Sequence, residues 1–433
     1  MSFPDPLPRA VPRRSITRPN VARPLRIAHV VNEPFSGESA SGVQQAVYCL
    51  AGAQVGIGES VAVFSRESGV HLLDAGAERC PGTPDATRRN PGTSLRGRLL
   101  WRYLRREFTD GVLGWSPDIV HFHSVHIPEN VALAETLTAA GVPYCVTVHG
   151  GLFAAALRRN RFKKAVFRVM FEREYLNRAR FIHAVSPHEI AGIRQQGVYR
   201  PVVVVPNGLP PGAFAEASRP DALFASSPWL GDRRVFMFVG RLEPWQKGLD
   251  LLVRAFSRAG LRNAALVLVG PDCRGSRRTL EALVDRHDIR DRVVFTGAAF
   301  GEDRANLLAA ADIFVHPSRW EGLSLSVLAA AAAGKPCLLT RDADPLGELA
   351  RADAALTVDA TVESIAAGLR RAAALSHPEL RAMGARARYA AESRFTWTSV
   401  APRLVEACRE ALEDGDEAHS AAAARQAVPE SWR

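Results

Sequence analysis

The chain has 433 residues, of which 47% are hydrophobic and 23% are charged, and its formal net charge is +10. A chain of this length and ordinary composition can bury more than one core, so we expect two or three domains. The positive charge is spread along the chain without a zinc-finger, basic-zipper or ribonucleoprotein signature, so we predict no nucleic-acid partner.

The two ends of the chain differ from its middle in composition. Residues 1–25 carry prolines and arginines without the apolar segment of a signal peptide, so we expect a disordered basic arm. Residues 414–433 are rich in alanine and polar side chains and are predicted to form a flexible tail. No apolar run reaches the roughly 18 residues that a membrane span needs. The six cysteines lie far apart without a Cys-x-x-Cys pair, which favours a cytoplasmic protein with reduced thiols.

Short runs rich in β-branched residues alternate with longer helical patterns from Arg26 onward. This rhythm is typical of a parallel sheet covered by helices on both faces. The strands predicted for a first sheet are residues 26–31, 60–64, 118–123, 143–149, 181–186 and 201–207. A segment rich in Pro, Ala and Ser follows at 209–228. The strands predicted for a second sheet are residues 234–240, 265–270, 293–297, 313–317, 335–340 and 355–358.

The restart of this rhythm predicts an α/β fold with two doubly wound, Rossmann-like domains that face each other across a cleft. We assign residues 26–208 to the N-terminal domain and residues 229–394 to the C-terminal domain. Ligands of such sheets bind at the carboxyl ends of the strands. The residues that follow the strands are therefore the candidate site residues.

Two cations flank the turn between the first strand of the second sheet and the next helix. Arg241 follows the glycine turn and Lys247 precedes the helix, in a chain with only four lysines. A compact ammonium and a forked guanidinium beside free helix N–H groups form a diphosphate clamp. The alternative interpretation is a helix start with two solvated cations. A second signal downstream, the segment Pro317-Ser-Arg-Trp-Glu-Gly-Leu-Ser-Leu-Ser-Val-Leu-Ala-Ala that contains Glu321, favours the clamp.

Nine short motifs follow one another in the order found in GT-B glycosyltransferases, and the chain most resembles glycosyltransferase family 4 over nearly its whole length. Each motif is weak alone, and their order gives the resemblance its strength. The motifs are Ser41-Gly42-Val-Gln-Gln, Asp118-Ile-Val-His-Phe-His-Ser, Val146-Thr-Val-His-Gly-Gly, Ala184-Val-Ser-Pro, Val204-Val-Pro-Asn-Gly, Gly240-Arg241 with Lys247-Gly248, Leu268-Val-Gly-Pro, Ala311-Asp-Ile-Phe-Val-His-Pro-Ser and Glu321-Gly-Leu-Ser-Leu.

The resemblance implies a GT-B fold in which a final helix, at about residues 395–413, returns to the N-terminal domain. It also implies a retaining transferase that moves a hexose from a nucleotide-diphosphate sugar to a glycan or lipid-linked acceptor, in polysaccharide or glycoconjugate biosynthesis. The C-terminal domain would hold the nucleotide sugar. The family generally uses no metal or other cofactor, so none is expected.

Roles for individual residues also follow from the resemblance. Arg241 and Lys247 would neutralise the donor phosphates as the leaving diphosphate gains charge. Glu321 would face the hydroxyl groups of the donor sugar, and His149 would reach the same sugar from the acceptor side. Gly42 matches a glycine that lets the backbone approach the diphosphate. The other positions expected at the donor are Gly240, Gly322, Leu323, Ser324 and Leu325.

One position departs from the family pattern. The family has a second glutamate eight positions after the first, which chelates the ribose of the nucleotide, and this chain has Ala329 there. Loss of that contact would weaken donor binding by roughly 1.5–3 kcal/mol, about ten- to a hundredfold. An alternative function is therefore a degenerate GT-B protein that acts as a binding or scaffold partner. The retained charges of Arg241, Lys247 and Glu321 argue against it, and the same motifs disfavour a nucleotide-sugar epimerase.

Three histidines raise the question of a metal site. Alternation along a strand puts His121 and His123 on one face, with His126 close behind. The sequence places no acidic or cysteine partner beside them, so we predict no metal. A wall of the cleft near the acceptor is their expected role.

Two basic amphipathic stretches, at residues 94–108 and 157–171, place Arg or Lys beside Leu, Phe and Trp at helical spacing. One interpretation is a pair of core-packed helices with a solvated arginine face. The other is docking on an anionic membrane, at its inner face, where a lipid-linked acceptor would lie.

Overall fold

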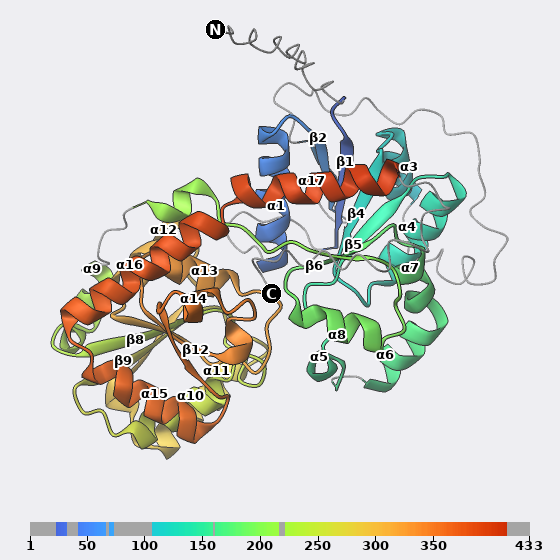
Figure 1. Ribbon diagram of the computed structural model, residues 1–433. Coiled ribbons are helices and arrows are strands. Elements are labelled where there is room, and N and C mark those ends of the chain that lie inside the picture. Colours follow the sequence, from blue (N-terminus) through green and yellow to red (C-terminus); the bar gives the residue numbers. More distant parts are fainter. Residues whose placement is uncertain are drawn as a thin grey trace, which may run out of the picture.

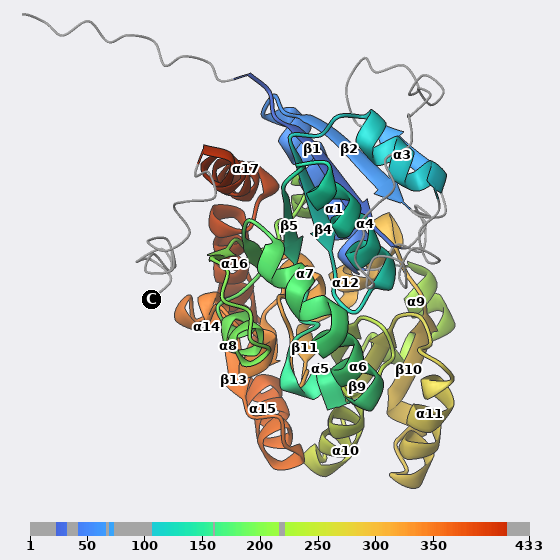
Figure 2. The same cartoon turned by 90° about the vertical axis from the view of Figure 1, so that its right-hand side faces the viewer.

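A computed structural model describes residues 23–32, 42–65, 69–72, 106–158, 161–215 and 221–413. Two lobes, each a sheet with helices on its faces, lie side by side (Figure 1), and a view turned by 90° shows the strands of the first lobe above those of the second (Figure 2). The prediction of two doubly wound α/β sheets is confirmed. Most of the predicted basic arm, the predicted tail and the larger part of the stretch 94–108 lie outside the described residues.

The first sheet has seven strands in the order β3-β2-β1-β4-β5-β6-β7. Every neighbouring pair is parallel except β3, which pairs antiparallel with β2 at the sheet edge. The strand β3 was not predicted, because four residues beginning with glycine carry too little pattern to indicate an edge strand. The strands are β1 Arg26–Val31, β2 Ser60–Ser65, β3 Gly69–Leu72, β4 Ile119–His123, β5 Tyr144–Thr147, β6 Ile182–Ala184 and β7 Val202–Val204.

Helices cover both faces of the first sheet; β4 and β5 are buried along their whole length, and β1 is buried from Ile27 onward. Tyr144 stacks on Tyr175 with ring centroids 5.6 Å apart, and Phe122 meets both rings edge-on. These contacts fix α7 against the sheet. The helices of this lobe are α1 Gly42–Gly56, α3 Arg106–Gly114, α4 Pro128–Ala139, α5 Ala154–Arg158, α6 Arg161–Phe167, the π-helix η2 Arg168–Glu172, α7 Arg173–Arg178 and α8 His188–Gln195.

The second sheet has six strands, all parallel, in the order β10-β9-β8-β11-β12-β13. The chain reverses its direction of winding between β8 and β11, so the loops that follow these two strands diverge and leave a crevice at their carboxyl ends. The first sheet has the same switch between β1 and β4. The strands are β8 Arg234–Val239, β9 Ala264–Val269, β10 Val293–Gly297, β11 Ile313–His316, β12 Cys337–Thr340 and β13 Ala355–Val358.

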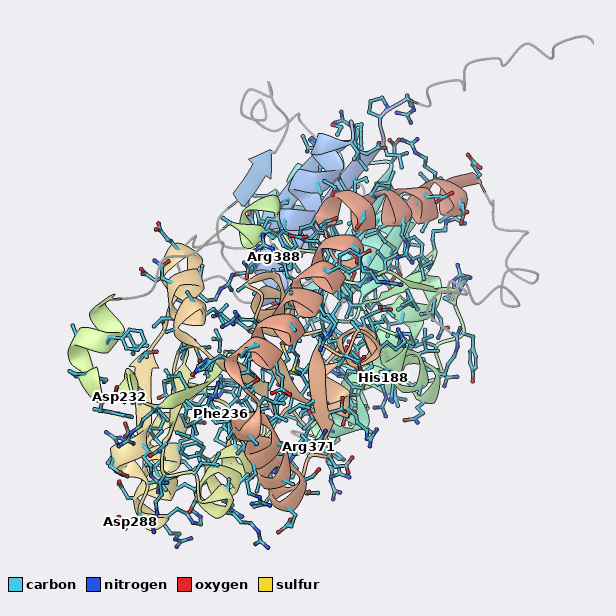
Figure 3. The ribbon with its side chains drawn as sticks, turned by 60° about the vertical axis from the view of Figure 1, so that its left-hand side comes forward. His188, Asp232, Phe236, Asp288, Arg371 and Arg388 are labelled. Carbon is cyan, nitrogen blue, oxygen red and sulfur yellow. The ribbon has the colours of Figure 1, made fainter. Side chains whose placement is uncertain are left out.

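The helices of the second lobe lead the chain back to the first. A capping box between Ser376 and Glu379 starts α16, which runs toward the first lobe with Arg388 near its upper end (Figure 3). Phe395 and Thr396 separate it from α17. The helices are α9 Asp221–Ser226, α10 Leu249–Ala259, α11 Ser276–Arg286, α12 Gly301–Ala310, α13 Leu325–Ala332, α14 Glu348–Arg351, α15 Val362–Ala374, α16 His377–Arg394 and α17 Trp397–Glu413.

Helix α17 packs on the first lobe across α1 (Figure 1). Its apolar face, which includes Trp397 and Leu404, is buried in one cluster with Ile27 and Leu50. The two connections between the lobes run together, because Leu209 donates its N–H to the Phe395 carbonyl oxygen at 2.6 Å. The final helix is therefore part of the first lobe, and the chain crosses between lobes twice at one place.

Candidate active site

The loop between β8 and α10 carries both cations of the predicted clamp. Gly248 caps α10 in the left-handed conformation, with φ of 65°. A Cβ at this position would collide with the carbonyl oxygen of Pro317, in the loop after β11. Glycine therefore allows the loops after the two switch-point strands to touch, and this contact brings Lys247 next to Glu321.

Lys247 and Glu321 form a largely buried ion pair. The Lys247 Nζ donates to Glu321 Oε1 at 2.6 Å, and the two side chains are 13% and 8% exposed. Ser318 Oγ donates to the same oxygen at 2.6 Å, and His316 Nε2 donates to it at 3.1 Å. Burial alone would raise the pKa of Glu321, but the Lys247 ammonium and the His316 hydrogen bond outweigh it and hold the pKa well below its ordinary value. Glu321 is therefore an anion with a fixed orientation.

These contacts of His316 and Ser318 with Glu321 were not predicted from the sequence. The imidazole of His316 lies parallel to the rings of Phe238 and Phe314, with centroid distances of 5.3 and 5.8 Å, and is completely buried. Burial lowers the pKa of His316, which keeps the ring neutral. Both residues belong to the Ala311-Asp-Ile-Phe-Val-His-Pro-Ser motif, so a signal was present. Its use as a support for Glu321 needed the strand geometry.

The Glu321 loop touches the first lobe through Gly322. A Cβ added to Gly322 would lie 3.1 Å from Glu189 Oε1 and 3.5 Å from the Gly150 nitrogen. Asn207, at the end of the first sheet, donates from Nδ2 to the Leu323 carbonyl oxygen at 3.4 Å. The loops of the two lobes therefore meet at the carboxyl ends of their strands, as the sequence analysis expected for a cleft ligand site.

His149 follows β5 in this contact region. Its φ is 46°, an uncommon conformation for a residue with a side chain. Glu189, at the start of α8, accepts the N–H of Gly150 and, at 2.6 Å, that of Val185. Burial raises the pKa of Glu189 to about 7, although the hydrogen bonds from these backbone N–H groups act to lower it. Glu189 thus fixes the His149 loop. This role could not be predicted from the sequence, since an acidic residue in the first turn of a helix is ordinary.

The other predicted donor positions lie around this pair without direct contact to it. Arg241 is exposed after β8, and its side chain has no partner among the described residues. Gly240 has φ of 154°. Gly42 is the first residue of α1, where a Cβ would meet no described atom within 4 Å, so the chain itself does not require glycine there. Ser324 is the N-cap of α13 and Leu325 is its first residue. The free N–H groups of the first turn of α13 therefore lie at the end of the helix that is nearest the crevice.

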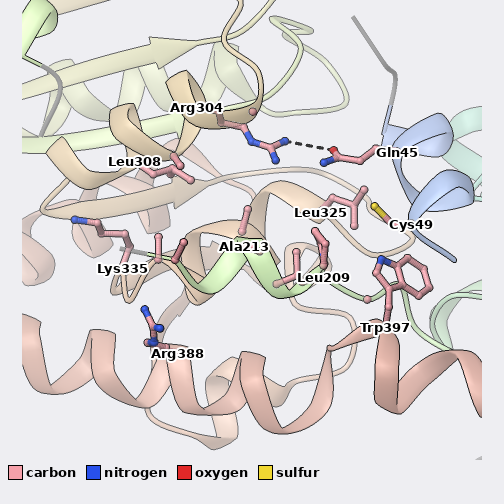
Figure 4. A pocket seen from close by; sticks show the side chains of 18 of the residues that line it. Gln45, Cys49, Leu209, Ala213, Arg304, Leu308, Leu325, Lys335, Arg388 and Trp397 are labelled. Carbon is pink, nitrogen blue, oxygen red and sulfur yellow. Dashed lines mark hydrogen bonds between the residues drawn. The ribbon is translucent and has the colours of Figure 1, made fainter. Parts of the chain in front are cut away.

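Ala329, the departure from the family pattern, lines a pocket of about 640 Å³ between the lobes (Figure 4). Arg304 donates to Gln45 Oε1 at 3.4 Å across this pocket, its one polar side-chain contact among the described residues. Lys335 and Arg388 also reach the pocket, but both donate to main-chain carbonyl oxygens. No lining residue is acidic. The position of the expected glutamate is therefore occupied by an apolar side chain, in a pocket that three cationic side chains also line.

The histidine cluster in the structure differs from the predicted one, because His29 takes the place of His126 beside His121 and His123. His29 on β1 pairs in register with His121 on β4, and with His123 these rings offer ligand atoms within 4.8 Å of one another. His126 lies apart from them, and its main-chain N–H donates to the Glu172 carboxylate. The three clustered rings could converge on a metal ion. However, His29 Nδ1 and His123 Nε2 already share a hydrogen bond of 2.9 Å.

Comparisons with known proteins agree with this geometry. Residues 40–208 match the family described as glycosyl transferase 4-like domain, and residues 233–374 match the family described as glycosyl transferases group 1. A D-inositol 3-phosphate glycosyltransferase of Saccharomonospora viridis is 32% identical over 215 residues, which are 47% of this chain and 49% of the relative.

A second relative has a lipid-linked substrate in its name. The UDP-Gal:alpha-D-GlcNAc-diphosphoundecaprenol alpha-1,3-galactosyltransferase of Escherichia coli is 30% identical over 235 residues, 52% of this chain and 57% of the relative. These matches span about half the length of each relative. Among solved structures, a sucrose-phosphate synthase from Thermosynechococcus elongatus superposes with a TM-score of 0.67 at 20% identity, over 89% of this chain and 98% of that one. At this identity the likeness concerns the fold alone.

Proposed function

Because this chain belongs to the group 1 glycosyltransferases of the GT-B fold, we propose that it is a retaining enzyme that transfers a hexose from a nucleotide-diphosphate sugar to a glycan or lipid-linked acceptor. The comparisons confirm the group 1 glycosyltransferase family and the GT-B fold that the motifs indicated. We place the proposed reaction in polysaccharide or glycoconjugate biosynthesis. The observation that carries the proposal is the Lys247–Glu321 ion pair, which lies beside the Gly322 contact with the loop of His149.

The proposed donor site uses charge that the chain itself supplies. Lys247, the unpaired Arg241 and the free N–H groups of α13 hold the diphosphate, whose charge increases as the sugar leaves. Glu321 Oε1 accepts all three protein hydrogen bonds, so Oε2 is the oxygen proposed to accept from a sugar hydroxyl. The proposed reaction includes no metal or organic cofactor, as the resemblance to the family implies.

The proposed chemistry occurs on one face of the sugar. The bond between the anomeric carbon and the diphosphate oxygen breaks, and the acceptor oxygen forms its bond on the same face. The acceptor proton passes to the departing phosphate oxygen, so the step needs no carboxylate base. Lys247 and Arg241 stabilise the diphosphate anion that this step produces.

A thermal-shift panel of UDP-, GDP- and ADP-sugars tests donor binding. A donor at 100 times its dissociation constant should stabilise the protein by about 2.7 kcal/mol. Lys247→Met should abolish the shift, whereas Lys163→Met, which removes an exposed lysine from α6, should retain it. Product analysis by NMR should then show the anomeric configuration of the donor. An inverted product, or no shift with any donor, contradicts the proposal.

Ala329 is the specific observation that favours the second candidate, a GT-B protein that binds without transferring. The two candidates differ in turnover. The test measures both the dissociation constant of a nucleotide sugar and the release of nucleotide diphosphate over hours at micromolar protein. Measurable binding without release, with any acceptor pool, would favour the binding protein.

We further propose that the segment from α6 to η2 docks on an anionic membrane. The prediction of a basic amphipathic stretch at 157–171 falls largely on these helices, and their basic residues stand among exposed apolar ones. Apolar side chains inserted at the headgroup level together with basic neighbours are typical of interfacial helices. The exposed apolar residues are Phe162 at 79%, Val169 at 68%, Met170 at 45% and Val166 at 42%.

Liposome co-sedimentation tests this docking surface. Binding should increase with the fraction of phosphatidylglycerol in phosphatidylcholine vesicles. Phe162→Ser with Val169→Ser should reduce it, whereas Tyr199→Ser, which changes a side chain that is 69% exposed elsewhere on the first lobe, should not. If binding to vesicles changes neither with the fraction of phosphatidylglycerol nor in the double variant, the proposal is wrong. None of the described helices has the length and apolarity needed to cross a bilayer.

A further inference from the structure

A row of hydrogen bonds leads from His149 into the core of the first lobe. His149 Nε2 lies 3.1 Å from His123 Nδ1, and His123 Nε2 lies 2.9 Å from His29 Nδ1. His29 Nε2 then lies 2.7 Å from Gln54 Oε1, on α1. His29, His123 and Gln54 are buried, and only His149 is partly exposed. The row therefore connects the loop at the candidate active site with a side chain that no solvent reaches.

Each ring in this row is neutral at pH 7. Burial lowers the pKa of His29 to about 4 and that of His149 to about 3, and burial together with the neighbouring imidazoles lowers the pKa of His123 well below its ordinary value. A neutral imidazole donates with one nitrogen and accepts with the other. In an unbroken row the direction of one hydrogen bond therefore sets the direction of all the others.

Gln54 sets that direction. The Gln54 amide is oriented with Oε1 toward His29 and Nε2 away from it; an amide oxygen can only accept, so in this orientation His29 carries its proton on Nε2 and accepts with Nδ1. His123 must then donate from Nε2 to His29, and His149 must donate from Nε2 to His123. We infer that Gln54, His29 and His123 are positioning residues that hold His149 as its Nε2–H tautomer, with Nδ1 left as an acceptor for a hydroxyl group of the donor sugar.

A second row runs beside the first and provides a control. His121 Nε2 lies 2.6 Å from Thr147 Oγ1, which lies 2.7 Å from His183 Nδ1, and His183 Nε2 donates to the Val205 carbonyl oxygen at 2.7 Å. This row ends on a carbonyl oxygen that can only accept, and none of its hydrogen bonds involves His149. Thr147→Val breaks it in the same core without changing the first row.

The test is the tautomer of His149, read from the ring ¹⁵N shifts of the full-length protein labelled at histidine. His149→Asn identifies the signal. The wild-type protein should show a protonated Nε2 and a bare Nδ1. Gln54→Leu removes the terminal acceptor, so the His149 signals should move toward the average of two tautomers. Thr147→Val should leave the His149 signals at the wild-type positions.

Activity gives a second readout, and only this part rests on the proposed function. Gln54→Leu should lower kcat by about tenfold or more while KM for the donor changes by less than about threefold, because the tautomer matters most as the sugar becomes cationic. If no nucleotide sugar is a substrate, the proposed function is wrong, whereas the ¹⁵N shifts still test whether the row of hydrogen bonds sets the tautomer of His149. The two failures are therefore distinguishable.

Three results overturn the inference. A protonated Nδ1 on His149 in the wild-type protein would reverse the direction of the row. Equal His149 signals in wild type and Gln54→Leu would show that Gln54 does not act on His149. Stoichiometric metal in the purified protein that His29→Asn removes would show that His29 and His123 coordinate an ion instead of sharing a proton.

Discussion

At the scale of single residues, Lys247 and Glu321 depend on each other. Each side chain is mostly shielded from water, so either charge alone would be costly to bury. Lys247→Met should therefore lower the melting temperature, and it should lower kcat/KM by about a hundredfold or more because the diphosphate loses its nearest cation. Differential scanning fluorimetry and initial rates measure the two effects.

A double-mutant cycle separates stability from function in this pair. Lys247→Met with Glu321→Gln removes both charges, so most of the lost melting temperature should return. Activity should not return, since the cation and the sugar-facing carboxylate are both absent. A double variant with restored activity would show that the pair is structural and that the diphosphate is held elsewhere.

Ala329 gives a test in the opposite direction. Ala329→Glu should tighten UDP-sugar binding about tenfold or more in calorimetry, since a carboxylate can accept two ribose hydroxyls. Ala333→Glu adds the same charge to the same pocket one helical turn further along and should not tighten it. Equal effects of both variants would mean that residue 329 does not face the ribose.

Motif residues and their supports differ in how far the sequence reveals them. Lys247 and Glu321 could be predicted together because each belongs to a motif with fixed spacing. Glu189 could not, because its role depends on the Gly150 and Val185 N–H groups that the fold brings to it from other strands. His29 was missed for the same reason, since its pairing with His121 requires β1 and β4 to be neighbours.

At the scale of elements, close approach between loops sets the site. The strands were predictable because parallel strands buried on both faces form continuous apolar runs. The contact between the loops after β8 and β11 was not, since no pattern within either loop encodes which atoms of the other loop will touch it. Gly248 shows this, because only the position of the Pro317 carbonyl oxygen explains why a side chain is excluded.

The two ends of α10 provide a matched pair for this contact. Gly248 and Gly260 both have left-handed conformations, with φ of 65° and 67°, but a Cβ at Gly260 meets nothing within 4 Å. Gly260→Ala should therefore cost only the backbone strain, about 1 kcal/mol. Gly248→Ala should lower the melting temperature further and weaken donor binding. Equal melting temperatures would show that the Pro317 contact relaxes without cost.

At the scale of the whole molecule, the buried imidazoles make the first lobe sensitive to acid. Burial lowers the pKa of His29 and of His183 from the ordinary 6.5 to about 4, and that of His149 to about 3, while His121 and His123 shift in the same direction. Between pH 6.5 and 4 the unfolded chain therefore binds protons that the folded lobe does not. The free energy of unfolding of the first lobe is therefore not reduced by these histidines above pH 6.5, and it decreases as the pH falls through this window.

This acid sensitivity should be confined to the first lobe. Among the described residues of the second lobe, His316 is the one histidine whose pKa is lowered. Hydrogen exchange, corrected for the intrinsic rate at each pH, should show protection in β1, β4 and β5 falling between pH 7 and pH 5 more than in β8 and β9. His183→Asn should reduce the pH slope, since one fewer buried imidazole then takes up a proton on unfolding. Equal loss of protection in both sheets would show that the histidine rows do not govern the acid response and that the lobes unfold as one unit, joined through α17.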